Sequence, residues 1–278
     1  IIIFSSAIDW LVIKKNKNLK LIYRDIRFSK IVNDCVKKVD YVIHLAALIS
    51  IPHSYKKPED HLTTNILGTL RLLESVKRNK IDPLIHICSS SEVFGRVPKE
   101  KIPINENCNF HPASPYAISK VGTDLLGKYY AEAFNLRAIV TRMFTHTGPR
   151  RGDVFAESSF AKQIALIELG KIPPIVKVGN LESLRTIADV RDAVRAYHLL
   201  LTHNPVPGEI YNIGGSYTCK IRDVLNTLIN FSEIKDIKIE VEQTRLRPID
   251  ADLQVPDTTK FRSHTGWAPE ISYEKTML

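Results

Sequence analysis

Tyr116 and Lys120 are the residues of this sequence whose types and spacing most directly suggest chemistry. They stand four positions apart just after Pro115, which suits the first turn of a helix because no amide donor is needed there. At i and i+4 their side chains share one helix face. A lysine cation beside a phenol favours the phenolate and so lowers the pKa of a tyrosine. Such a pair can move a proton on and off a hydroxyl group while a hydride is transferred to a nicotinamide.

Ser90 and Glu92 are two further candidates, and they follow an apolar run of strand length, 84–88. A serine at a strand end can hydrogen-bond the same substrate oxygen as the tyrosine, whereas Glu92 adds a carboxylate that hydride transfer alone does not need. A lone Tyr-x-x-x-Lys is common on helices and by itself indicates nothing. The prediction therefore depends on the serine-rich strand end and the proline-started helix together.

Alternating strand and helix patterns must position these residues. We expect strands at 19–22, 40–47, 84–88 and 137–144, with helices at 31–38, 61–79 and 116–134. Segment 40–47 is expected to be a buried parallel strand. Asp189 is expected to cap the start of a later helix, because its carboxylate can accept from a free amide there. This order predicts an α/β fold with a doubly wound parallel sheet.

The catalytic candidates and their neighbours resemble the extended short-chain dehydrogenase/reductase family, from residue 19 almost to the end of the chain. In that family Ser (or Thr), Tyr and Lys are the catalytic set, which corresponds to Ser90, Tyr116 and Lys120. The resemblance implies a Rossmann-type fold that binds NADP or NAD. It places Asp25 and Ile26 at the adenine ring, although an aspartate in a surface turn is an equally good interpretation of Asp25. The further positions that it implies at the cofactor are Leu45, Ala46 and Ala47, whereas His44 and Asn65 are interpreted as structural.

Four later motifs narrow the resemblance to the branch of the GDP-mannose 4,6-dehydratases and GDP-4-keto-6-deoxymannose reductases. They are 146–152 (HTGPRRG), 178–182 (VGNLE), 189–192 (DVRD) and 247–250 (RPID). The resemblance implies that Arg185 and Arg247 hold the diphosphate of a nucleotide sugar and that Asp250 binds its ribose, while surface ion pairing is the alternative for all three. Thr145 stands where the family usually has Asn. A substrate contact is expected at this position, but through a threonine side chain.

The branch implies a lyase, a 4,6-dehydratase that acts on GDP-mannose with a recycled cofactor, in which Glu92 is the base. Three alternatives stay open. They are a reductase of the 4-keto product, an epimerase or dehydratase of another nucleotide sugar, and a non-catalytic dinucleotide-binding sensor. The resemblance also implies a homodimer or homotetramer.

Two domains are expected. Residues 1–145 with about 187–215 would bind the dinucleotide, and about 146–186 with 216–278 would bind the nucleotide sugar. The N-terminus departs from this plan, because the first glycine of the chain is Gly68 and no glycine-rich phosphate loop precedes it. Ile1–Phe4 is a plausible first strand and Asp9–Ile13 a piece of the first helix. We expect residues to be missing between Phe4 and Leu19, so that the intact protein would exceed 31.5 kDa.

Composition excludes several classes of function. The net charge of +9 is concentrated near the N-terminus, but no stacking aromatics accompany the lysines, so we expect no nucleic-acid partner. No apolar run approaches the ~20 residues that span a bilayer, and no membrane partner is expected. The four cysteines have no metal-ligand spacing, so we expect no metal. They are interpreted as free thiols of a cytoplasmic protein.

Overall fold

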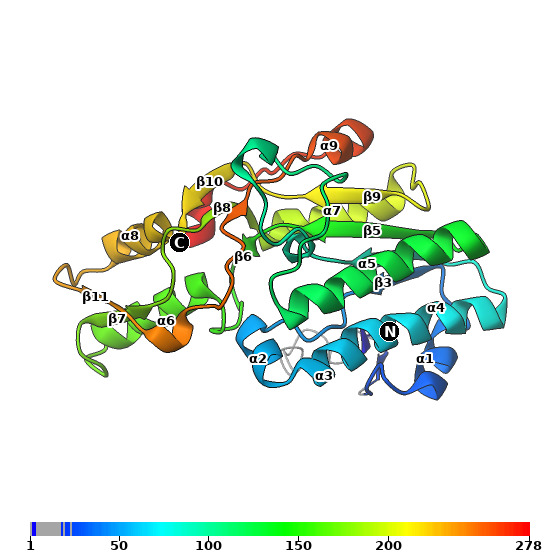
Figure 1. Cartoon of the computed structure of the whole chain (residues 1–278), viewed down its shortest axis with the longest axis horizontal. Helices are drawn as coiled ribbons and strands as arrows, with labels where there is room; N and C mark the ends of the chain where they lie inside the picture. Colours follow the sequence, from blue (N-terminus) through cyan, green and yellow to red (C-terminus); the bar gives the residue numbers. More distant parts are fainter. Residues whose placement is uncertain (1, 4–17, 19, 23) are drawn as a thin grey trace. The chain divides into compact units, whose positions relative to one another are not determined.

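The computed structural model describes residues 2–3, 18, 20–22 and 24–278, and these form two compact units (Figure 1). Unit 1 comprises residues 1–89, 115–141 and 204–210, and unit 2 comprises 90–114, 142–203 and 211–278. Residues 90–114, 142–145, about 187–203 and 211–215, which were expected in the dinucleotide domain, thus group with unit 2. The assignment of one ligand to each domain stays a prediction.

The main sheet consists of parallel strands in the order β3-β4-β5-β9, with β3 at Tyr41–His44, β4 at Leu84–Cys88, β5 at Ala138–Met143 and β9 at Ile210–Ile213. Tyr41 lies opposite Leu84, and Ile85 lies opposite Ala138. A separate parallel pair joins β1 (Ile2–Ile3) to β2 (Leu21–Ile22). The predicted helix at 9–13, the site of the glycine loop and the proposed gap lie outside the described residues.

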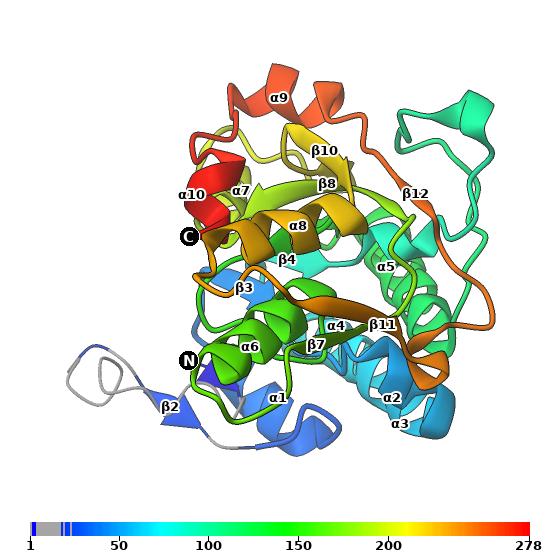
Figure 2. The ribbon, with the colours of Figure 1, turned by 90° about the vertical axis from the view of Figure 1, so that its left-hand side faces the viewer.

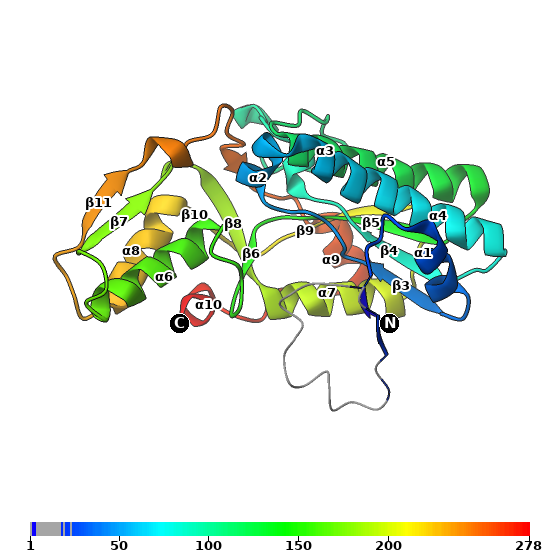
Figure 3. The same cartoon turned by 90° about the horizontal axis from the view of Figure 1, so that it is seen from below.

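The helices of unit 1 bury their apolar faces in one core. In Figure 1, α4 (Gly68–Asn79) runs beside α5 (Pro115–Phe134), and Figure 3 shows α1 (Ser29–Val36) against α4. The apolar residues of α4 recur at helical spacing, so that one stripe faces inward. The helix ends at Asn79, and the capping residue Lys80 takes the left-handed conformation with φ 50°. The buried members of this core include Val32, Leu72, Leu73, Val76, Ile85, Ile87, Tyr130 and Val140.

Two sequence predictions about unit 1 require correction. Segment 40–47 is not a buried strand, because β3 lies at the end of the described four-stranded sheet and Tyr41 and Ile43 are half exposed. The predicted helix at 61–79 is also not uniform. It is built from α3 (Pro58–His61), a π-helical segment η3 (Leu62–Leu67) and α4. The remaining helix of this region is α2 (Ile51–Lys56).

Unit 2 is built around β8 (Leu184–Asp189), which pairs with β10 (Tyr217–Lys220), β12 (Leu253–Gln254) and β6 (His146–Thr147). Figure 2 shows α6 (Ala156–Glu168) beside α8 (Ile221–Phe231), with the parallel pair β7 (Ile175–Val178) and β11 (Lys238–Val241) next to α6. The shared core includes Phe160, Ile164, Val176, Val178, Ile187, Val224 and Leu225. Short elements complete the unit: η4 (Ser91–Val93), η5 (Lys99–Lys101), η6 (Gln243–Arg245), α9 (Thr259–Thr265) and α10 (Tyr273–Met277).

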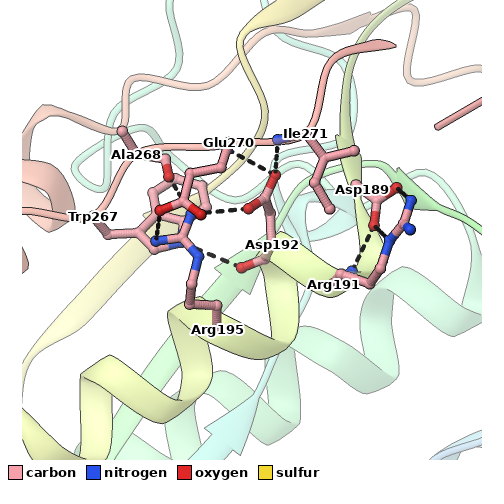
Figure 4. Close-up of polar contacts among 8 residues, drawn as sticks. All are labelled: Asp189, Arg191, Asp192, Arg195, Trp267, Ala268, Glu270 and Ile271. Atoms are coloured by element: carbon pink, nitrogen blue, oxygen red, sulfur yellow. Dashed lines mark hydrogen bonds and ion pairs between the residues drawn. The ribbon is translucent and has the colours of Figure 1, made fainter. Parts of the chain in front are cut away.

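Helix α7 (Val190–Thr202) anchors the C-terminal segment of unit 2 (Figure 4). The predicted cap is confirmed, since the Asp189 carboxylate accepts from the amide of Arg191 at 2.8 Å. Asp192 is 2% exposed and accepts from the amides of Glu270 (3.0 Å) and Ile271 (2.9 Å) and from the Arg195 guanidinium (2.9 Å). One buried carboxylate therefore holds the chain end against α7.

No helix in the described part of the chain is long and apolar enough to cross a membrane.

Candidate active site

Tyr116 and Lys120 lie one turn apart in the first turns of α5, and both are buried, with 8% and 4% of their surface exposed. The Lys120 ammonium donates to the carbonyl oxygen of Cys88 at 2.8 Å, at the carboxyl end of β4. Burial lowers the pKa of Lys120, and the neighbouring Cys88 and Asp124 oppose that effect. The end of β4 and the start of α5 thus hold a buried cation one helical turn from the phenol.

Asn65 braces this part of α5, in agreement with its structural interpretation. It lies in the π-helical segment η3, and its amide donates to the Ser119 hydroxyl (2.8 Å) and to the Leu48 carbonyl (2.9 Å) while accepting from the Leu48 amide (2.8 Å). Ser119 in turn donates to the carbonyl of Tyr116 at 2.7 Å. Local π-helical windings are frequent at functional sites. Here the π-helical segment carries Asn65, whose side chain links the segment after β3 to the helix of Tyr116 and Lys120.

Three histidines near these residues are buried, and burial lowers the pKa of each. Burial lowers the pKa of His44 and of His86 to about 3 in each case, and the Lys120 charge adds to the effect. His44 shares a hydrogen bond with Thr69 (2.8 Å), which agrees with its structural interpretation. His61 packs edge-on against the Tyr116 ring, with centroids 6.2 Å apart. Sequence reasoning missed His61, because no local pattern marks a contact between residues so far apart along the chain.

The expected cofactor positions differ in their surroundings. Asp25 is half-buried and accepts from the backbone and guanidinium of Arg27 at 2.6–2.9 Å, which holds the pKa of Asp25 below its usual value. Ile26 is 7% exposed and belongs to the core of unit 1. Leu45 is 54% exposed, and Ala46 and Ala47 are partly exposed. The roles of these residues at a cofactor stay predictions.

Unit 2 brings together four of the predicted site residues. Arg247 Nη1 lies 4.0 Å from Glu92 Oε1, and Arg247 Nε lies 3.9 Å from Asp250 Oδ1. Arg185 is 8% exposed, and burial lowers its pKa while Glu92, Asp250 and Glu157 raise it. Asn180 orients Asp250 by donating to its carboxylate at 2.8 Å. Two arginines and two carboxylates that are far apart in the sequence therefore form one group, which we call the arginine–carboxylate cluster (Glu92, Arg185, Arg247 and Asp250).

Ser90 and Thr145 have simpler surroundings. Ser90 caps the start of η4, and its hydroxyl accepts from the amide of Glu92 at 3.2 Å, which fixes the backbone that carries the glutamate. Thr145 is half-buried, and its backbone carbonyl accepts from the Ala188 amide at 2.9 Å. The hydrogen bond of Thr145 therefore places its backbone beside β8.

These features define a class of protein. Unit 1 combines a parallel sheet with a tyrosine and a buried lysine on one helix, an arrangement that resembles the short-chain dehydrogenases. Unit 2 offers two guanidinium groups, which suit a diphosphate because each can make two parallel hydrogen bonds to it. The chain belongs to the GDP-mannose 4,6 dehydratase family, whose family model matches residues 5–277.

Individual relatives agree with this assignment. The chain is 32% identical over 238 residues to a GDP-6-deoxy-D-mannose reductase of Pseudomonas aeruginosa, covering 86% of this chain and 78% of the relative. It is 30% identical over 246 residues to GDP-mannose 4,6 dehydratase 1 of Arabidopsis thaliana, and the match covers 86% of this chain and 66% of that relative. The solved structure of RMD from Pseudomonas aeruginosa complexed with NADPH matches with a TM-score of 0.85 at 30% identity. The match covers 93% of this chain and 86% of that structure's chain. The predicted Rossmann-type α/β fold is confirmed.

Proposed function

We propose that this protein is a nucleotide-sugar 4,6-dehydratase that converts GDP-mannose to its 4-keto-6-deoxy product with a recycled NADP or NAD. The observation that carries the proposal is the arginine–carboxylate cluster, in which Glu92 lies 4.0 Å from Arg247. A diphosphate held by the arginines would bring the attached hexose close to this glutamate. Membership of the GDP-mannose 4,6 dehydratase family supports the same substrate.

The residues of unit 1 fit the nicotinamide and ribose half of such a cofactor. Lys120 offers a buried ammonium at the end of β4, and Ala46 and Ala47 leave room for a close approach after β3. The sequence has no glycine before Gly68 for the pyrophosphate half. Structures with 30% and 24% identity to this chain contain NADPH and NAD, respectively, which supports either dinucleotide. When bound, the nicotinamide would accept a hydride from C4 of the sugar and return it to C6.

The proposed roles of the residues follow from their chemistry. Tyr116 takes the proton of the C4 hydroxyl, the Lys120 cation stabilises the phenolate, and Ser90 orients the hydroxyl. The C4 ketone acidifies the C5 proton. Glu92 takes that proton and gives it to the departing C6 hydroxyl, so that water leaves. A proton from solvent then replaces it at C5, and the sequence of steps loses one water with no net oxidation.

This mechanism predicts an isotope label. In D₂O the product should carry deuterium at C5, as measured by NMR. The Glu92→Gln variant should lose both the dehydration activity and the deuterium label at C5, whereas Tyr116→Phe should block the preceding oxidation at C4. A product without deuterium at C5 would contradict the role of Glu92.

The second candidate is a reductase of the 4-keto sugar. The observation that favours it is the 32% identity to the Pseudomonas reductase. A reductase would use Ser90, Tyr116 and Lys120 without a base at C5. It would consume reduced cofactor in proportion to product, which a dehydratase does not.

A homodimer or homotetramer is part of the proposal. Ile118, Leu125 and Tyr129 are 50%, 51% and 55% exposed on α5 and recur at helical spacing, so they form one uncovered apolar stripe. Pairing of two copies through this stripe would bury it. Leu125→Glu should then give a monomer by light scattering, and an unchanged mass would refute pairing through α5. A cytoplasmic location is also proposed, supported by the four free cysteines.

A further inference from the structure

Gln254 is a fully buried amide whose hydrogen-bonding capacity is unused. It ends the short strand β12, its side chain is 1% exposed, and neither its nitrogen nor its oxygen has a partner among the described residues. A buried polar group without a partner destabilises a fold, so native proteins rarely keep one without a reason. An apolar side chain of similar size would fill the same space without that cost.

The position of Gln254 connects it to the arginine–carboxylate cluster. In the parallel pairing of β12 with β8, Gln254 lies directly opposite Arg185. Paired residues of neighbouring strands are about 4.8 Å apart and project from the same face of the sheet. The Cα atom of Gln254 therefore lies beside that of Arg185, the most deeply buried arginine of the cluster, and both side chains leave the sheet on the same face.

The chemistry of the amide limits what it can bind. Its nitrogen donates and its oxygen accepts, so a complementary ligand must offer an acceptor and a donor together. A diphosphate oxygen only accepts, and it would leave the amide oxygen unpaired. A sugar hydroxyl does both, and nucleotide sugars carry hydroxyls on either side of the diphosphate.

We propose that Gln254 is a specificity-determining residue that hydrogen-bonds a sugar hydroxyl of a ligand whose diphosphate is held by Arg185. This inference rests on the proposed function. It gives the site a contact that selects for a hydroxylated ligand over a bare diphosphate. Three ligands distinguish a ribose hydroxyl from a hexose hydroxyl. Inorganic pyrophosphate carries no sugar, GDP carries the ribose, and GDP-mannose carries both the ribose and the hexose.

The test compares Gln254→Leu and Gln254→Met with Gln163→Leu in the full chain. Gln163 is the matched control, because it is half-buried and its amide is paired with Ser159 and Lys177. Both Gln254 variants should melt at a higher temperature than the wild type and bind GDP-mannose about tenfold more weakly. Gln163→Leu should melt at a lower temperature and bind with unchanged affinity.

The three ligands and the melting curves decide the outcome. Equal weakening for GDP and GDP-mannose with no change for pyrophosphate supports a ribose hydroxyl, and weakening for GDP-mannose alone supports a hexose hydroxyl. Unchanged affinity for all three ligands, or a lower melting temperature with unchanged affinity, overturns the role of Gln254. A wild-type protein that binds neither GDP nor GDP-mannose refutes the proposed function itself, which is a distinct result.

Discussion

Replacing Glu92 by glutamine is expected to tighten the binding of GDP. Glu92 Oε1 lies 4.0 Å from Arg247 Nη1, so its negative charge competes with a diphosphate for the same guanidinium and repels it. Unit charges at this distance interact by about 1 kcal/mol in water and about 4 kcal/mol at an effective dielectric constant of about 20. The two side chains are 16% and 32% exposed, so solvent still screens the pair, and we take the lower figure as the minimum. About 1 kcal/mol corresponds to a roughly fivefold lower Kd.

Isothermal titration with GDP measures this change without any turnover. The matched control is Glu233→Gln, which removes the same charge from an exposed position of unit 2 and should leave the Kd unchanged. The difference between Glu92→Gln and the wild type should shrink in high salt, because the pair is partly exposed to screening ions. An equal or weaker affinity of Glu92→Gln for GDP would refute the competition between carboxylate and diphosphate.

Three further predictions concern the stability of the fold and the support of the site. Asp192→Asn should lower the free energy of unfolding by about 2–4 kcal/mol in urea titrations, because an amide cannot satisfy both Arg195 and two backbone donors; a loss below about 0.5 kcal/mol would contradict this. For Lys120 the folded-state pKa lies below 10.5, so the unfolded chain binds more protons and stability should rise as the pH increases towards that value. The free energy of unfolding of Lys120→Met, measured with urea, should lack this rise. If the free energies of the variant and the wild type changed in parallel with pH, the contribution of Lys120 would be refuted. Asn65→Ala should lower kcat more than it raises KM, because it frees the turn of α5 that carries the catalytic pair; unchanged kinetics would show that the brace is dispensable.

Local chemistry explains which elements the sequence could predict. The strand at 84–88 has the predicted bounds, because an apolar run with flanking polar residues marks it. Asp189 was recognisable as a cap from its own side chain and the residues that follow. Tyr116 and Lys120 share a helix face because both positions belong to the same short segment.

The features that the sequence could not predict depend on distant parts of the chain. The exposure of Tyr41 and Ile43 follows from the place of β3 in the described sheet, and the composition of the strand does not reveal that place. The proximity of Glu92 to Arg247 requires two segments of unit 2 to fold together. Gln254 is an ordinary polar residue in the sequence, and only its burial without a partner in the described part of the chain makes it a candidate for binding.

The central claim is tested most directly by incubating the protein with GDP-mannose and a catalytic amount of NADP, and in parallel NAD, and following the sugar nucleotide by mass spectrometry. The account predicts the loss of one water from GDP-mannose with no net reduction of the cofactor. Unchanged GDP-mannose, together with stoichiometric consumption of reduced cofactor when the 4-keto sugar is supplied, would contradict the dehydratase and establish the reductase.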